Sequence, residues 1–293
     1  MNLAAPAHVH GTHDAVYVAT SIAFALIGSF AALVSAVRIP SADGAARFRW
    51  ITAAAISLGG GAIWSMHFIG MLGYHVGDRQ IVYNLPLTAL SLVIAIVASG
   101  VGLAVVGTNP RNRARLVFSG LLTGLGVGAM HYTGMAAMRV GSKVTYQPEL
   151  VAASLAIAVM AALAAFWIAY RVRTMWHIVG ASVVMAVAVC GMHYTGMAAT
   201  RVAATDHPAD VPGADPISLT FAVCVIAFTV LSMVIFAAFN SLNESQHNAA
   251  HQRRGQDRNG RHAAAQGPST RTPQRPKAFA AEDPSTDYFA GRQ

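Results

Sequence analysis

Charged residues are scarce in this chain, making up 11% of its 293 residues against 55% that are hydrophobic. Ordinary globular domains carry about 25% charged residues, so a water-soluble fold explains this composition poorly. Seven stretches contain no Asp, Glu, Lys or Arg, and each is long enough to cross a bilayer, which takes about 20 apolar residues in a helix. These stretches are residues 15–37, 50–72, 85–107, 116–138, 150–170, 175–199 and 217–239.

Cysteine is rare and catalytic signatures are missing. Cys190 and Cys224 both lie in predicted spans, where cysteine usually serves as a small buried side chain, so no disulfide framework is indicated. No basic segment precedes the first span, which we therefore expect to remain uncleaved. The sequence shows no nucleophile elbow, phosphate-binding loop or paired carboxylates, and we expect no enzymatic activity.

Basic residues, in contrast, are distributed unevenly between alternate connections. Eight lie on one side and four on the other, and the side with more Lys and Arg in short loops is usually cytoplasmic. We therefore expect a multi-pass protein of the plasma membrane with its amino terminus outside and its carboxyl terminus in the cytoplasm. The net charge of +8 then reflects orientation, and no nucleic-acid partner is expected. The eight are Arg38, Arg47, Arg49, Arg111, Arg113, Arg115, Arg171 and Arg173, and the four are Arg79, Arg139, Lys143 and Arg201.

An internal repeat is the strongest feature of the sequence. It reads MHFIGM in the first copy (Met66–Met71) and MHYTGM in the second (Met130–Met135) and third (Met192–Met197). The histidines are separated by 64 and 62 residues, about the length of two membrane spans with their connections. We predict an all-α fold: a polytopic membrane bundle of seven transmembrane helices, built from three two-helix repeats plus a final helix. Residues 1–12 are expected to form a short extracytoplasmic terminus, 13–239 the membrane domain, and 240–293 a disordered basic cytoplasmic tail.

The repeat carries residues with metal-binding side chains. Each copy places one histidine near the carboxyl end of an even-numbered span, roughly 8 to 10 Å below the outer boundary at about 1.5 Å per residue. A methionine four residues later shares its helical face, and imidazole together with thioether favours copper over zinc or iron. The predicted ligands are His67, His131, His193, Met66, Met71, Met130, Met135, Met192 and Met197. Tyr132 and Tyr194 are predicted to orient the imidazoles or to anchor the helices at the membrane interface. Gly70, Gly134 and Gly196 are predicted to permit close helix packing.

These motifs resemble those of the MHYT-domain family of bacterial integral membrane sensors, over roughly residues 13–239. The resemblance implies a copper site near the outer face, formed by Met, His and Tyr side chains, and a role in sensing oxygen, carbon monoxide or nitric oxide. The first copy departs from the pattern at Phe68 and Ile69, so it supplies no phenol. Many family members join this unit to cyclic-di-GMP-metabolising or DNA-binding domains, so a signal from this chain is expected to pass to a separate partner.

Four interpretations of the motifs remain open at this point. The first is a signalling sensor in which three histidines hold copper that binds O2, CO or NO or responds to redox state. The second is copper handling or metal transport, although the spans lack the acidic residues and proline-broken helices that coupled transporters use. The third is a membrane haem protein with two axial histidines. The fourth is purely structural, with each histidine hydrogen-bonded to a neighbouring helix.

Overall fold

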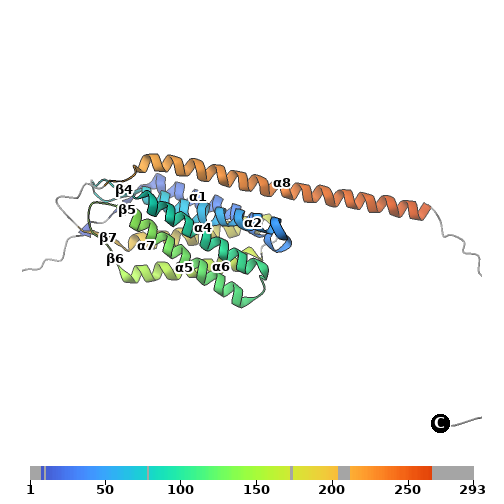
Figure 1. Ribbon diagram of the computed structural model, residues 1–293, viewed down its shortest axis with the longest axis horizontal. Coiled ribbons are helices and arrows are strands. Elements are labelled where there is room, and N and C mark those ends of the chain that lie inside the picture. Colours follow the sequence, from blue (N-terminus) through green and yellow to red (C-terminus); the bar gives the residue numbers. More distant parts are fainter. Residues whose placement is uncertain (1–7, 10, 78, 172–173, 204–211, 266–293) are drawn as a thin grey trace, which may run out of the picture. The chain divides into compact units, whose positions relative to one another are not determined.

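The computed structural model describes residues 8–9, 11–77, 79–171, 174–203 and 212–265 (Figure 1). Within these residues, seven helices are long and apolar enough to cross a membrane, which confirms the predicted multi-pass helical fold. The chain divides into two compact units, residues 1–242 and 243–293, and all seven spans lie in the first.

Three helical hairpins follow one another along the chain. The first joins α1 (Ala15–Ala36) through the 3-10 helix η1 (Ile39–Ser41) to a long composite helix. That helix consists of α2 (Gly44–Ala55), the π-helical segment η2 (Ile56–Trp64) and α3 (Ser65–Leu72). The second hairpin consists of α4 (Leu85–Thr108) and α5 (Arg113–Ala137), and the third of α6 (Pro148–Ala169) and α7 (Met175–Ala198). The seventh span begins α8 (Pro216–Ala265).

Short antiparallel strand pairs close each hairpin at the end that carries the motifs. The pairs are β2 (Thr12–His13) with β3 (Tyr74–His75), β4 (Val82–Tyr83) with β5 (Met138–Arg139), and β6 (Val144–Tyr146) with β7 (Thr200–Ala203), to which β1 (His8–Val9) adds. At each closure, the residue before the first helix donates its backbone N–H to a carbonyl at the end of the second. The donors Asp14, Asn84 and Gln147 each lie 2.9 Å from the acceptors Gly73, Ala137 and Ala199. The sequence repeat is therefore also a repeat of hydrogen bonds.

The six helices of the three hairpins form a closed ring, because α7 packs against α1. Each motif-bearing helix contacts its partner in the hairpin and the first helix of the next hairpin, so η2 touches α4, α5 touches α6, and α7 touches α1. Glycine makes these approaches close. A Cβ atom on Gly124 of α5 would lie 2.5 Å from the Cα atom of Val159 in α6, so no larger residue fits there.

Helix α8 packs against the first hairpin. Leu231 of α8 forms a buried cluster with Phe24 and Ala31 of α1 and Ile69 of α3. Near the opposite end of the hairpin, the Arg38 guanidinium donates from Nη2 to the Ala238 carbonyl of α8 over 2.6 Å. These contacts attach the seventh span to one hairpin of the ring.

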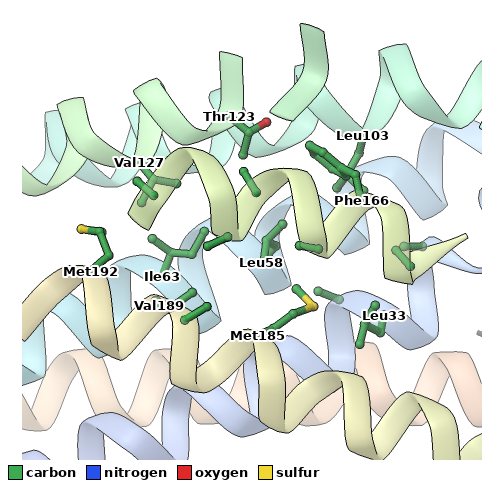
Figure 2. A pocket seen from close by; sticks show the side chains of 18 residues that line it. Leu33, Leu58, Ile63, Leu103, Thr123, Val127, Phe166, Met185, Val189 and Met192 are labelled. Atoms are coloured by element: carbon green, nitrogen blue, oxygen red, sulfur yellow. The ribbon is translucent and has the colours of Figure 1, made fainter. Parts of the chain in front are cut away.

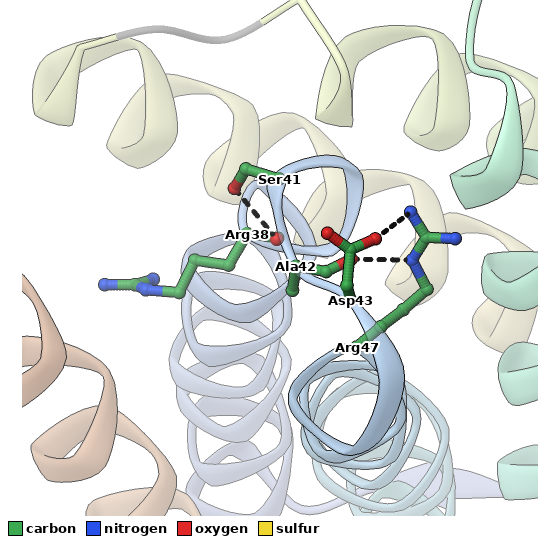
Figure 3. Close-up of polar contacts among 5 residues, drawn as sticks. All are labelled: Arg38, Ser41, Ala42, Asp43 and Arg47. Carbon is green, nitrogen blue, oxygen red and sulfur yellow. Dashed lines mark hydrogen bonds and ion pairs between the residues drawn. The ribbon is translucent and has the colours of Figure 1, made fainter.

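The turn between α1 and α2 is held by polar contacts of its own. Arg47 donates from Nε to the Ala42 carbonyl over 2.9 Å, and its Nη2 lies 3.7 Å from a carboxylate oxygen of Asp43 (Figure 3). Arg38 points away from this turn, towards α8 (Figure 3). The other two connections at this end, after α4 and α6, also carry arginines.

The end of the last helix differs from the prediction. Disorder is expected from Asn240, but α8 continues to Ala265, so that expectation is wrong for residues 240–265. A membrane span supplies a formed helix to which each further residue adds one hydrogen bond, and the Ala, Gln, Glu and Arg of this segment favour helix. Residues 266–293 of the expected tail, and residues 1–7 and 10 of the expected N-terminal segment, lie outside the described part of the chain.

Candidate metal centre

The three motif histidines meet in the middle of the ring. His67, His131 and His193 are each completely buried, and one ring nitrogen from each lies within 4.8 Å of the others. Nδ1 of His67 is 3.0 Å from Nδ1 of His193 and 3.1 Å from Nδ1 of His131. The histidines lie five, six and five residues before the ends of α3, α5 and α7, so equal depth in three helices brings them into one layer.

The spacing of these nitrogens suits a small cation. A metal bound at about 2.0 Å to tetrahedrally arranged nitrogens separates them by roughly 3.3 Å, which is close to the two shorter Nδ1 separations. Two nitrogen lone pairs facing each other at 3.0 Å also repel unless a proton or a metal lies between them. The donor set of three imidazoles therefore fits a bound copper or zinc ion.

The Nε2 side of each imidazole, opposite to Nδ1, lies against a motif glycine. A Cβ atom on Gly70 would lie 2.6 Å from Nε2 of His193, and Cβ atoms on Gly134 and Gly196 would lie closer still to Nε2 of His67 and His131. Each histidine thus lies over the glycine of the next copy around the ring. Each motif glycine therefore allows a histidine ring of a neighbouring helix to pack against its backbone. Nε2 of each of the three histidines has no hydrogen-bond partner within the described residues.

The tyrosines of the motif link each copy to the next hairpin. The Tyr132 hydroxyl lies 2.7 Å from Oγ of Ser154 in α6, and the Tyr194 hydroxyl lies 2.9 Å from Oγ of Ser21 in α1. Both serines donate their own proton to a carbonyl three residues earlier, over 2.8 Å. A serine hydroxyl has one proton, so in both pairs the tyrosine is the donor. The tyrosine rings pack edge-on against the imidazole of their own copy, at 4.8 Å between centroids.

The first copy makes the same link with a different side chain. Phe68 has no hydroxyl, and the equivalent serine, Ser91 of α4, instead accepts a hydrogen bond of 2.9 Å from Nε1 of Trp64. Trp64 lies one turn before Phe68 and stacks on it, with 3° between the ring planes. Ser91 also donates to the Thr88 carbonyl, which matches the other two serines. All three hairpins are therefore joined to the next by a donor that reaches a serine.

The six predicted methionine ligands lie in the buried core of the same bundle. All are at most 2% exposed and belong to the same buried cluster: Met66, Met71, Met130, Met135, Met192 and Met197. Their burial leaves them available as soft donors or as packing groups around the three imidazoles.

A fourth imidazole lies beyond Tyr194. The ring of His13 is 5.4 Å from that of Tyr194 and 5.1 Å from that of Tyr74, both between centroids. Burial, and secondarily the neighbouring His75, lower the pKa of His13 below its ordinary value. A lowered pKa favours the neutral form of the His13 imidazole.

Sequence reasoning missed the serines and Trp64. Ser21, Ser91 and Ser154 are spaced by 70 and 63 residues, the same spacing as the helix-capping positions Asp14, Asn84 and Gln147. These serines can be identified from the sequence when the repeat is aligned over the first helix of each hairpin as well as the motif helix. The repeat does not identify Trp64, because Trp64 lies four residues before Phe68, the position that holds tyrosine in the other two copies.

Comparison with known proteins assigns this arrangement to a family. Residues 60–119 and 124–182 match the MHYT repeat, described as a bacterial signalling protein N-terminal repeat. The chain belongs to the MHYT family. Its first and second motif copies lie within the matched residues, and it is accordingly a membrane protein of a signalling family. No solved structure matches the chain.

Curated relatives support the same assignment. The bifunctional diguanylate cyclase/cyclic di-GMP phosphodiesterase MucR of Pseudomonas aeruginosa is 40% identical over 195 residues, covering 65% of this chain and 28% of that protein. The cyclic di-GMP phosphodiesterase NbdA of the same organism is 35% identical over 243 residues, covering 78% and 30%. The signaling protein YkoW of Bacillus subtilis is 27% identical, covering 78% and 29%. This MHYT chain spans less than a third of each relative.

Proposed function

We propose that this MHYT protein is a membrane sensor whose His67, His131 and His193 bind one copper ion. The convergence of the three imidazoles carries this proposal, because Nδ1 of His67 lies 3.0 and 3.1 Å from the other two Nδ1 atoms and a shared metal ion would relieve the repulsion between their lone pairs. Copper is preferred to zinc because each motif carries two buried methionines close to its histidine in the sequence, and thioethers are soft donors. Bound copper supplies a coordination position for a diatomic gas or a redox change.

The chain's own residues position this site and shield it from water. The glycines admit the imidazoles, the tyrosines and Trp64 fix the motif helices to the next hairpin, and burial keeps competing water ligands out. A ligand that binds two packings of the motif helices unequally shifts the balance between them. We infer that the shift reaches α8 through Ile69 and Leu231, and from there a separate cytoplasmic or membrane partner.

The proposed orientation places the motif end outside the plasma membrane and the arginine-bearing connections in the cytoplasm. Its support is the excess of arginine in the connections after α1, α4 and α6. The metal layer then lies near the outer face, where gas or copper arriving from outside reaches it first. Accessibility of single cysteines introduced at Arg79 and Arg111 to an impermeant thiol reagent in intact cells tests this orientation, in a background without Cys190 and Cys224.

Two alternatives predict different measurements. A porphyrin ring would have to separate two axial imidazoles, whereas Nδ1 of His67 and Nδ1 of His193 lie only 3.0 Å apart, so the geometry weighs against haem; a Soret absorption band in the purified protein would favour it. Copper handling shares the same ligands but predicts exchange of bound Cu(I) with an external acceptor. Slow exchange together with a gas-dependent copper spectrum favours the sensor.

The test of the proposal is the copper content of the purified protein in detergent. We expect about one copper per chain in the wild type and at least about tenfold weaker binding in each of His67→Ala, His131→Ala and His193→Ala, because each removes one of three ligands. His177→Ala is the matched control, since His177 lies exposed on the same helix as His193. Copper retained in all three variants with the fold intact contradicts the proposal.

A further inference from the structure

A cavity of about 50 Å³ lies between the helices beside the histidine layer, and every helix of the ring contributes to its wall (Figure 2). One side chain from each helix illustrates this: Leu33, Ile63, Leu103, Val127, Phe166 and Val189. A wall shared by all six helices places the cavity inside the ring.

Three of these residues locate the cavity relative to the candidate metal centre. Ile63, Val127 and Val189 each lie four residues before a motif histidine, on the same face of the same helix. Four residues of helix correspond to about 6 Å, so the cavity begins about one turn from the imidazole layer on all three helices. Met192, which precedes His193, also lines it.

The lining determines what the cavity can hold. Its side chains are apolar except for Thr123, whose hydroxyl already donates to the Ala98 carbonyl over 3.1 Å. A buried water needs two to four polar partners, and this wall does not offer them. One water molecule requires roughly 10–15 Å³ of such a cavity, so a volume of about 50 Å³ leaves room for a small molecule. Ions are excluded as well, because the wall carries no charge.

We propose that this cavity is a binding chamber for a small uncharged molecule of the size of a diatomic gas, held one helical turn from the three histidines. The inference deepens the proposed sensor function, since it adds a place where gas accumulates before it reaches the imidazole layer. It also stands apart from the metal, because the cavity wall contains no histidine.

Xenon is the probe, because it is uncharged, apolar and small, and it needs no metal. Titration of the purified protein in lipid nanodiscs, followed by 129Xe chemical shift, is expected to show saturable binding in the wild type, and equal binding in the wild type treated with a metal chelator. Ala162→Leu adds a side chain to the cavity wall and is expected to weaken xenon binding at least about tenfold. Ala164→Leu is the matched control on the same helix, because Ala164 is exposed and does not line the cavity.

The outcomes separate this proposal from the sensor function. Absence of saturable xenon binding, or equal binding by Ala162→Leu and the wild type, overturns the chamber. Loss of binding in Ala164→Leu as much as in Ala162→Leu overturns it too, because the response then does not come from the cavity. If Ala162→Leu fails to fold, Val189→Leu provides the same test with a smaller change of volume. Absence of copper contradicts the proposed function and leaves the xenon result untouched.

Discussion

The first motif copy and the other two perform the same packing task with different residues. In the second and third copies, Tyr132 and Tyr194 reach a serine of the next hairpin from the motif itself. In the first copy, Phe68 fills the tyrosine position, and Trp64 reaches Ser91 from one turn earlier. The link to the next hairpin is therefore maintained, while the residue that makes it changes.

The position after the aromatic residue differs for a related reason. Ile69 stands where the other copies have Thr133 and Thr195, which are only half-buried. Ile69 is completely buried in the cluster with Leu231 of α8. An apolar side chain suits a face covered by another helix, so the departure of the first copy from MHYT marks the site where the seventh span packs.

The backbone also distinguishes the first copy. Its helix passes through the π-helical segment η2 just before the motif, whereas α5 and α7 are α-helical throughout. Three consecutive glycines lie in this segment, and π-helical segments frequently occur at functional sites. This irregular helix also packs against α8, so the motif helix with a π-helical segment is the one that contacts the seventh span.

The largest expected effect comes from adding a methyl group to the motif glycines. Gly134→Ala and Gly196→Ala are expected to destabilise the protein by about 3 kcal/mol or more, because the new Cβ overlaps an imidazole held in a packed core. Gly70→Ala should cost less, since its contact with His193 is less severe. Thermal unfolding in detergent measures all three, with Gly191→Ala as control because its Cβ meets nothing within 4 Å. Equal stability of Gly191→Ala and Gly196→Ala contradicts the packing account.

A second prediction compares neighbouring glycines of η2. A Cβ on Gly61 would lie 2.6 Å from Cδ2 of Leu231, whereas one on Gly60 makes only ordinary contacts at 3.6 Å or more. Gly61→Ala is therefore expected to loosen α8, with faster amide hydrogen exchange in residues 216–240 and a loss of roughly 1–2 kcal/mol. Gly60→Ala should leave exchange in α8 unchanged. Indistinguishable exchange in the two variants would show that this contact does not hold α8.

The smallest effect is expected from the hydrogen bonds to serine. Tyr132→Phe and Tyr194→Phe should each cost about 1 kcal/mol, because each removes one donor while the serine keeps its bond to its own helix. Trp64→Phe should cost at least as much, since Ser91 loses its donor and indole packing is lost. Adding Phe68→Tyr to Trp64→Phe is expected to restore part of that loss, as the first copy then resembles the others. Absence of any rescue in the double variant contradicts the equivalence of the three links.

Much of this arrangement follows from the sequence by simple physics. Apolar length gives the seven spans, and equal distance from three helix ends predicts that His67, His131 and His193 share a layer. The sequence does not predict which motif copy each histidine contacts. A histidine lies over the glycine of the next copy because of the rotation of each helix about its axis, which the sequence alone does not give. Trp64 is unpredictable for the same reason. Its indole makes the hydrogen bond that a tyrosine hydroxyl makes in the other copies, but from a different position in the sequence. The continuation of α8 beyond Phe239 does not follow from the composition of residues 240–265, because the preceding membrane span supplies the formed helix that this polar segment extends.

The most direct test of the central claim is X-ray absorption spectroscopy of the copper-loaded protein. The account predicts three imidazole nitrogens at about 2.0 Å from copper, with methionine sulfur as an additional scatterer at most. In His131→Ala, the imidazole contribution of any residual copper should fall to two. A first shell made only of sulfur, or three imidazoles that persist in His131→Ala, would contradict a copper site shared by the three hairpins.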